Sequence, residues 1–399
     1  MRTMATARQT HAPGSKLGLL SVFVSTLFQL SGVFMLSPLI LLMLKKAEVS
    51  TTVAGLFAAS TWLGIFIMTP FASIVTQKMG RRATMWLSSV MPLIAALGYF
   101  TTSNLGVWLA LILIAGLADG LRWVLAEAFI AEFAPPGQTG RYIGAFATMI
   151  GLTFVIGPTL LAWIGPDSND APWVVITLLT TGLACTALIP LLPPDHNTDT
   201  ARVGLNGLWH AVVSHPVIML AGFVGGFFEL GLASILPLYG LTLGLGASAA
   251  ALLVSVSGAG STLVALPAGV LADQFASPAL GRRTLMTAFT ALILLATSAS
   301  LFVAHHSWLV WPMVCIWGAA GGALYTLAMI DIGAREKGLS LVNSTAVLVL
   351  TYTLGGLVAS GLSGALIEHT LTVGFPALSL TVAAIGLAAL LHTKRSADR

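Results

Sequence analysis

The stretch Gly80-Arg81-Arg82 and its copy Gly281-Arg282-Arg283 stand about 200 residues apart, each at the start of a long apolar run. The register continues further along the chain. With one more residue of offset, Gly116-Leu-Ala-Asp-Gly120-Leu-Arg-Trp123 aligns with Gly318-Ala-Ala-Gly-Gly322-Ala-Leu-Tyr325. Both copies hold a Gly-x-x-x-Gly step followed by an aromatic residue, and small residues at that spacing let helices approach closely. The chain therefore carries an internal repeat.

The composition is that of a membrane protein. Of the 399 residues, 57% are hydrophobic and only 8% are charged, and the mean hydropathy is +0.94; an ordinary soluble domain has about 25% charged residues. Apolar runs of about 20 residues, long enough to cross a bilayer, recur from Leu17 to Leu391. Because lipid offers the backbone no hydrogen-bond partners, every span should be helical. We predict twelve spans, at residues 17–44, 51–77, 83–102, 106–133, 140–164, 172–192, 216–243, 247–274, 284–304, 308–331, 339–367 and 373–392.

The predicted fold is an all-α membrane protein of twelve transmembrane helices in two parallel six-helix halves. A polar interruption at residues 193–215 divides the spans six and six and is predicted to be a cytoplasmic linker. The first half is predicted at residues 17–192 and the second at residues 216–392, with cytoplasmic tails at 1–16 and 393–399. Two such halves are the symmetry of a facilitator-type transporter, whose substrate site lies between them near the bilayer midplane.

The basic residues predict the orientation. Nearly all of them fall on the side of the Gly-Arg-Arg loops, as do Lys78 and Arg335, whereas the loops of the other side hold only Lys45 and Lys46. The positive-inside rule places the Gly-Arg-Arg side and both termini in the cytoplasm. We expect an integral multi-pass protein of the cell (inner) membrane. The net charge of +4 is spread over short loops, so no nucleic-acid partner is expected.

Three sequence motifs carry a family resemblance. Gly269-Val-Leu-Ala-Asp273-Gln-Phe275, followed after residues 276–280 by Gly281-Arg282-Arg283, looks like the cytoplasmic loop motif of the major facilitator superfamily. The first copy has Gln77 where that family usually carries an acid. Leu121-Arg-Trp123 with Glu127, and Leu236-Pro-Leu-Tyr239, look most like the YcaD-type branch of the drug and metabolite proton antiporters. The resemblance covers nearly the whole chain and implies the major facilitator fold and secondary transport.

Charged residues inside the apolar spans are the first candidates for function, because an ionised carboxylate at a helix centre costs about 2.5–3.5 kcal/mol on insertion scales. Asp119 and Arg122 lie three residues apart in the fourth span, so that Arg122 can reach Asp119 along the helix. Two interpretations stay open for this pair. It takes part in proton coupling or substrate binding, or it is an ion pair that only makes two buried charges tolerable.

Glu127 in the fourth span and Glu229 in the seventh have no basic partner nearby in sequence. For Glu127 we expect a carboxyl that faces the central cavity and binds a proton or a cation, with helix packing as the alternative. Glu229 lies among glycines that permit close backbone approach. A lone carboxyl at low dielectric favours its protonated form and is a candidate proton site. The alternative is a protonated glutamic acid that donates one structural hydrogen bond.

Two further acids, Glu132 and Asp331, lie close to the cytoplasmic ends of spans. The resemblance implies that they pair with the arginines of the Gly-Arg-Arg loops. The predicted cytoplasmic gate comprises Arg81, Arg82, Glu132, Asp273, Arg282, Arg283 and Asp331. Polar and aromatic side chains inside the spans are predicted to line a substrate cavity, or else to act as interhelical hydrogen-bonding groups. They are Gln29, Trp123, Tyr325, Asn343 and Tyr352.

The predicted function is secondary active transport by alternating access, in which a proton-coupled efflux of small amphipathic or cationic compounds is driven by the proton gradient. A proton-coupled uptake symporter of a small metabolite is the rival hypothesis. A membrane enzyme or a non-transporting sensor is disfavoured because the sequence shows no nucleophile–base set and no sizeable soluble domain. No metal spacing and no Walker loop occur, so no cofactor is expected. The expected partners are the small-molecule substrate, protons and the lipid bilayer, and the chain is expected to be a monomer.

Overall fold

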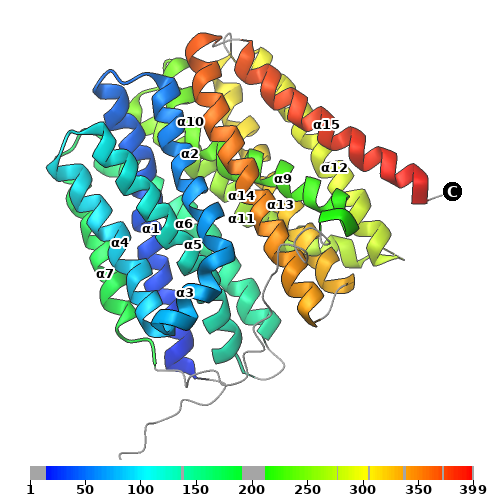
Figure 1. Cartoon of the computed structure of the whole chain (residues 1–399). Helices are drawn as coiled ribbons and strands as arrows, with labels where there is room; N and C mark the ends of the chain where they lie inside the picture. The colour runs from blue at the N-terminus through cyan, green and yellow to red at the C-terminus, as the bar shows by residue number, and fades with distance from the viewer. Residues whose placement is uncertain are drawn as a thin grey trace, which may run out of the picture.

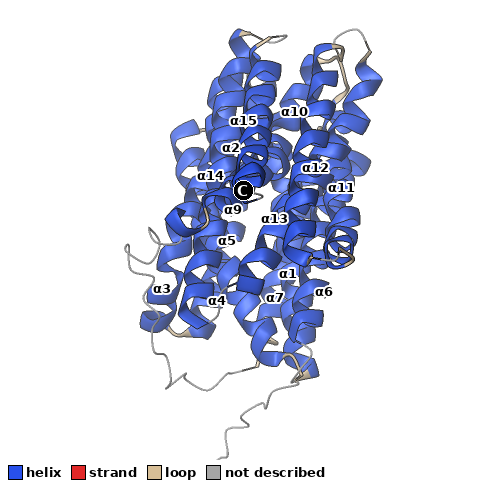
Figure 2. Cartoon of the chain, turned by 90° about the vertical axis from the view of Figure 1, so that its right-hand side faces the viewer, coloured by secondary structure: helices blue, strands red, loops and turns tan. Residues whose placement is uncertain are grey.

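The computed structural model describes residues 15–135, 139–190, 212–275, 277–303, 306–335, 338–370 and 373–397, and these residues form helices joined by short turns (Figures 1 and 2). The first half comprises α1 (Lys16–Lys46), α2 (Thr51–Met68), η1 (Thr69–Phe71), α3 (Ala72–Met79), α4 (Arg81–Thr101), α5 (Leu105–Phe133), α6 (Thr139–Ile164) and α7 (Ala171–Thr186). The second half comprises α9 (Pro216–Gly226), η2 (Phe227–Gly231), α10 (Leu232–Thr242), α11 (Ala247–Asp273), α12 (Pro278–Ser298), η3 (Ala299–Leu301), η4 (Ser307–Leu309), α13 (Val310–Arg335), α14 (Gly338–His369) and α15 (Gly374–Ala397).

Every predicted span corresponds to a helix or to a stack of helical segments. Among the described residues, eleven helices are long and apolar enough to cross a membrane. The sixth predicted span, residues 172–192, also forms a helix, but this helix is too short to be one of the eleven. It is α7, which ends at Thr186 and has 16 residues, whereas a straight crossing needs about 20. The predicted linker lies largely at residues 191–211, outside the described ranges.

Two spans are interrupted. In the second span, Pro70 lies in the 3-10 turn η1 between α2 and α3, as expected of a residue that cannot donate a backbone hydrogen bond. In the seventh span the interruption is η2, a π-helical turn between α9 and α10 that carries Glu229. Such turns are rare and occur often at functional sites. The irregularity therefore lies at Glu229, whereas Pro237 stands inside α10.

The two halves meet along two seams, α2 against α14 and α6 against α11. Figure 1 shows the helices of the first half, blue to green, beside those of the second half, which run on to red. Small residues make the first seam close: a Cβ added to Gly55 would lie 2.8 Å from the Cα of Gly364. Glycine at both positions is therefore required for the observed approach of α2 to α14.

One end of the bundle carries the Gly-Arg-Arg residues and is here termed the arginine end; the opposite end, where α1 finishes, is termed the Lys46 end. The hydrogen bonds that join the described parts of the two halves lie in the portion of the helices nearer the Lys46 end. They are Thr52 N–Glu368 Oε2 at 2.6 Å, Trp62 Nε1–Ser234 Oγ at 3.0 Å, Thr159 Oγ1–Ser255 Oγ at 3.0 Å and Ser255 Oγ–Val155 O at 3.2 Å. The halves are thus joined at the Lys46 end.

Candidate proton and substrate site

The carboxyl of Glu229 is held by hydroxyls from two other helices. Ser261 on α11 donates to Oε1, and the phenol of Tyr352 on α14 donates to Oε2. The π turn directs Glu229 toward these partners, and Gly321 and Gly322 of α13 leave room for it: a Cβ on Gly322 would lie 3.1 Å from Oε1. No ion pair to Glu229 occurs among the described residues.

Glu127 has a different environment. Its Oε1 accepts a hydrogen bond of 3.0 Å from the indole Nε1 of Trp123, one turn earlier on α5. Its Oε2 accepts no hydrogen bond from the described residues. This oxygen is not fully buried, so a ligand can approach it. Glu127 is half-buried and, like Glu229, forms no ion pair in the described part of the chain. One oxygen of Glu127 is therefore free to meet a ligand.

An aromatic cluster from both halves adjoins the two glutamates. Tyr325 on α13 lies within electrostatic reach of Glu127 and of Glu229, and its ring centroid is 4.5 Å from that of Tyr352. Trp62 of α2 and Trp123 of α5 belong to the same cluster. The full cluster comprises Trp62, Ile65, Trp123, Phe154, Leu230, Tyr325, Tyr352 and Leu357. It combines residues of both repeats, which is where a facilitator-type transporter holds its substrate.

Arg122 lies in a separate cluster inside the first half. Its side chain is 1% exposed, and its guanidinium donates to three hydroxyls from three helices: Thr26 on α1 at 3.2 Å, Ser89 on α4, and Thr186 on α7 at 3.4 Å. Ser89 and Thr186 also bond each other at 3.0 Å. Arg122 thereby ties together the four helices α1, α4, α5 and α7.

The predicted contact between Asp119 and Arg122 is not formed. The two terminal nitrogens of Arg122 face the hydroxyl cluster instead, while Arg122 Nε and Asp119 Oδ1 are buried without a hydrogen-bond partner among the described residues. The prediction failed because hydroxyls on three other helices compete for the guanidinium. The two opposite charges still act on each other at longer range.

Gln29, predicted to line the cavity, also lies inside the first half. It is fully buried, its Nε2 donates to the backbone carbonyl of Ser89 at 3.2 Å, and its Oε1 packs against Gly182 of α7. The structure therefore does not place Gln29 in the aromatic cluster, unlike Trp123, Tyr325 and Tyr352. The side chains of Asn343 on α14 and Asp273 on α11 lie outside the described part of the structure.

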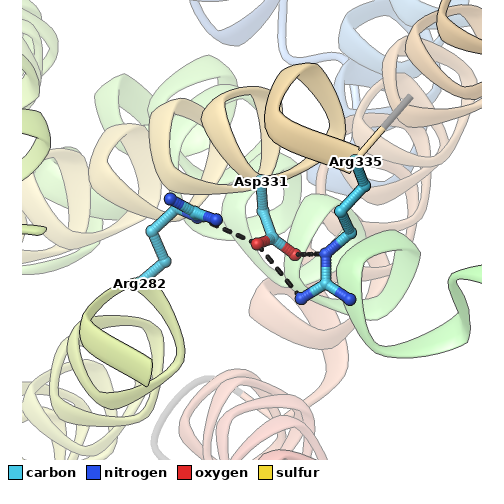
Figure 3. A network of polar contacts seen from close by, with 3 residues as sticks. All are labelled: Arg282, Asp331 and Arg335. Carbon is cyan, nitrogen blue, oxygen red and sulfur yellow. Dashed lines mark hydrogen bonds and ion pairs between the residues drawn. The ribbon is translucent and has the colours of Figure 1, made fainter. Parts of the chain in front are cut away.

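The repeat of Gly-Arg-Arg is matched by a repeat of ion pairs at the arginine end. Arg81 of α4 binds Glu132 of α5, and Arg282 of α12 binds Asp331 of α13 at 2.9 Å. Figure 3 shows that Arg335 joins the second pair, with Nε 2.9 Å from Asp331 Oδ2. Asp331 is thus held between two guanidinium groups. Arg82 and Arg283 take no part in these two pairs.

Sequence reasoning missed three kinds of residue in these sites. Ser261, the second donor to Glu229, stands in a run of small residues that gives no signal of its own. Trp62 and Phe154 belong to apolar runs and resemble lipid-facing aromatics in sequence. The hydroxyls around Arg122 each come from a different helix, and their meeting depends on the fold. No group of residues that could hold a metal ion occurs in the part of the chain that the structure describes.

Comparison with known proteins agrees with this arrangement. The family model described as Major Facilitator Superfamily matches residues 22–336. An uncharacterized MFS-type transporter, YfkF of Bacillus subtilis (strain 168), is 22% identical over 373 residues, which cover 91% of this chain and 92% of the relative. The MFS-type transporter YcaD of Salmonella paratyphi A (strain ATCC 9150 / SARB42) is 24% identical over 352 residues, with 84% and 85% covered. The crystal structure of a D-xylose-proton symporter superposes with a TM-score of 0.71 at 16% identity, covering 94% of this chain and 95% of the symporter.

The helical bundle of two repeated halves, with polar groups from both halves at its centre, defines a polytopic secondary-transporter fold. The chain belongs to the Major Facilitator Superfamily and, as the sequence motifs indicated, resembles its YcaD-like members. It is an integral multi-pass membrane protein. The family and the relatives point to a transporter of small molecules rather than an enzyme.

Proposed function

We propose that the chain is a proton-coupled exporter of small amphipathic or cationic compounds. The observation that carries this proposal is the pair Glu127 and Glu229, two half-buried carboxyls from opposite halves that meet one aromatic cluster and have no cationic partner in the described residues. Leaving a charged carboxylate unpaired inside a membrane protein is unfavourable. Binding either a proton or an organic cation relieves that cost, and exchange of one for the other is antiport.

The closed seam at the Lys46 end supports alternating access. In this state Thr52 and Trp62 of α2 bond across to Glu368 and Ser234 of the second half. For a substrate to pass, these bonds break while the halves rock about the central site. The charge distribution favours a cytoplasmic location of the arginine end and of both termini, in an inner membrane. The proposed energy source is the proton gradient alone, acting without a cofactor on a monomer.

Uptake by proton symport is the second candidate. It is supported by the similarity in fold to the D-xylose-proton symporter. Against it stands the character of the central cluster, which is aromatic and acidic: carboxylates and aromatic faces attract cations.

Flux measurements in proteoliposomes test the proposal. Purified protein is reconstituted, a pH difference is imposed, and movement of the organic cation ethidium is followed with and without a protonophore. Export by antiport is expected to move ethidium against the direction of proton flow, and reversal of the pH difference is expected to reverse the flux. Ethidium movement in the same direction as the protons supports symport. If a panel of cations, sugars and nucleosides shows no protein-dependent flux, the transport proposal is wrong.

A further inference from the structure

The two central glutamates differ in the number of hydrogen bonds that their carboxyl oxygens already accept. Both oxygens of Glu229 accept hydroxyl hydrogen bonds, from Ser261 and Tyr352. Glu127 accepts one bond, from the indole of Trp123, and keeps Oε2 open. Because a ligand ammonium needs a carboxylate oxygen that it can approach, only Glu127 offers one without breaking an existing contact.

From this difference we propose a division of labour: Glu127, beside the Trp123 indole, binds the cationic group of the substrate, and Glu229, held by Ser261 and Tyr352, carries the proton. This inference rests on the proposed function and assigns separate tasks to the two acids. It makes Trp123 a contact for an organic cation and makes Ser261 and Tyr352 positioning residues of the proton site.

The surroundings of Glu127 suit an organic cation. Trp123 lies one turn away on the same face of α5, and it packs in one cluster with Trp62 of α2 and Phe154 of α6. A cation over an aromatic face, and over indole most of all, is attracted by the ring quadrupole. The carboxylate supplies the opposite charge. A bulky cation with apolar substituents would satisfy both features, whereas a small hydrated ion would leave the aromatic faces unused.

The surroundings of Glu229 suit a proton. Its packing is tight, because a Cβ on Gly321 would lie 2.9 Å from the Cβ of Glu229. The titratable groups that face it are Tyr352 from α14 and Tyr325 from α13, while α11 contributes the neutral Ser261. No charged partner from the described residues meets it. A proton needs no additional room, and a hydroxyl can turn from donor to acceptor when the carboxyl becomes neutral.

Tyr325 explains how the two sites communicate. It lies within electrostatic reach of both glutamates and its ring contacts that of Tyr352, a direct partner of Glu229. A cation placed at Glu127 therefore acts on Glu229 through space across this ring pair. Its positive charge favours the ionised form of Glu229 and promotes loss of the proton. Binding of the organic cation at Glu127 and binding of the proton at Glu229 therefore disfavour each other.

The test separates binding from coupling on one set of preparations. Binding is measured with tetraphenylphosphonium in detergent solution, with tetraphenylborate as a probe of the same shape and opposite charge. Coupling is measured as ethidium flux against external pH in proteoliposomes. Glu127→Gln is expected to weaken tetraphenylphosphonium binding at least tenfold and to leave the weak binding of tetraphenylborate unchanged or stronger. Glu229→Gln is expected to bind tetraphenylphosphonium within about threefold of wild type but to lose the response of flux to pH.

Ser261→Ala provides a second, milder variant. Removing one donor to the carboxylate favours its protonated form, so the pH midpoint of flux should move to a more alkaline value by on the order of one unit. Thr262→Val is the matched control, because the Thr262 hydroxyl bonds the carbonyl of Gly258 on its own helix and not Glu229. A merely structural role of Ser261 predicts equal effects of the two substitutions.

The outcomes distinguish this inference from the proposed function. If wild-type protein shows no pH-driven flux of ethidium or of any other cation in the panel, the proposed function fails. If wild type transports but Glu229→Gln loses binding while Glu127→Gln loses the pH response, the roles are reversed and the division of labour is wrong. An unshifted midpoint in Ser261→Ala also overturns the inference.

Discussion

Arg282 Nε lies 2.9 Å from Asp331 Oδ1 inside the protein, and the corresponding pair of the first half, Arg81 with Glu132, lies nearer to solvent. The side chains of Arg282 and Asp331 are 7% and 3% exposed, whereas those of Arg81 and Glu132 are 24% and 37% exposed. The internal repeat has therefore kept the pairing but not its environment. The two pairs should differ in what they contribute to stability.

Asp331→Asn is expected to destabilise the protein by about 3 kcal/mol, because it leaves the Arg282 guanidinium buried without its carboxylate. Glu132→Gln is expected to cost about 1 kcal/mol or less, as at other partly exposed pairs. Melting temperatures in detergent provide the measurement. Equal losses for the two variants would contradict the difference in burial as the controlling factor.

The Arg122 cluster gives a paired test on neighbouring serines. Ser89→Ala removes an acceptor of the buried guanidinium and is expected to cost about 1.5–3 kcal/mol. Ser88 is equally buried, but its hydroxyl bonds only Met85 of its own helix, so Ser88→Ala should cost about 1 kcal/mol or less. The loss of stability in each variant is measured by thermal unfolding in detergent. A larger loss in Ser88→Ala would mean that the hydroxyls do not hold Arg122.

The close approach of α9 to α14 beside the π turn depends on Gly226, where an added Cβ would collide with the backbone carbonyl of Tyr352. Gly226→Ala is expected to push α14 away, to cost about 1–3 kcal/mol and to weaken the pH response of flux by moving Tyr352 from Glu229. Gly144 on α6 has no atom within 4 Å of the corresponding Cβ position, so Gly144→Ala should be neutral or slightly stabilising. A normal pH response in a folded Gly226→Ala variant would show that this close approach of α9 to α14 is not needed for proton coupling.

Topology is tested by labelling single cysteines in a background lacking Cys185 and Cys315. Positions near Lys78 and Arg335 are expected to react only from the cytoplasm, because the arginine end carries most of the basic loop residues. Positions near Asp167 and His305 should react from outside; Asp167 lies at the Lys46 end, where its Oδ1 is 2.9 Å from Lys46 Nζ. The reverse labelling pattern at either pair contradicts the proposed orientation.

Comparison of sequence and structure shows which contacts the sequence could predict. The pairs Arg81–Glu132 and Arg282–Asp331 follow from position along each span, because residues near the same membrane surface come to the same depth. Trp123 and Glu127 stand four residues apart, a spacing that brings side chains together on a helix, and these two are joined by a hydrogen bond. Contacts that depend on helix rotation could not be predicted. Ser261 meets Glu229, and Gln29 turns away from the centre, only because of how α11 and α1 are rotated in the bundle.

The measurement that tests the central claim most directly is proton release on ligand binding. Tetraphenylphosphonium is added to purified protein in weakly buffered detergent solution, and released protons are counted with a pH indicator. Wild type is expected to release protons on saturation, because the bound cation at Glu127 displaces the proton of Glu229. Glu229→Gln is expected to bind the cation and to release fewer protons than wild type, because only Glu127 can then give up a proton. Ser261→Ala is expected to release protons over a more alkaline range than wild type. Undiminished release from a Glu229→Gln variant that binds the cation normally would contradict the assignment of Glu229 as the proton carrier.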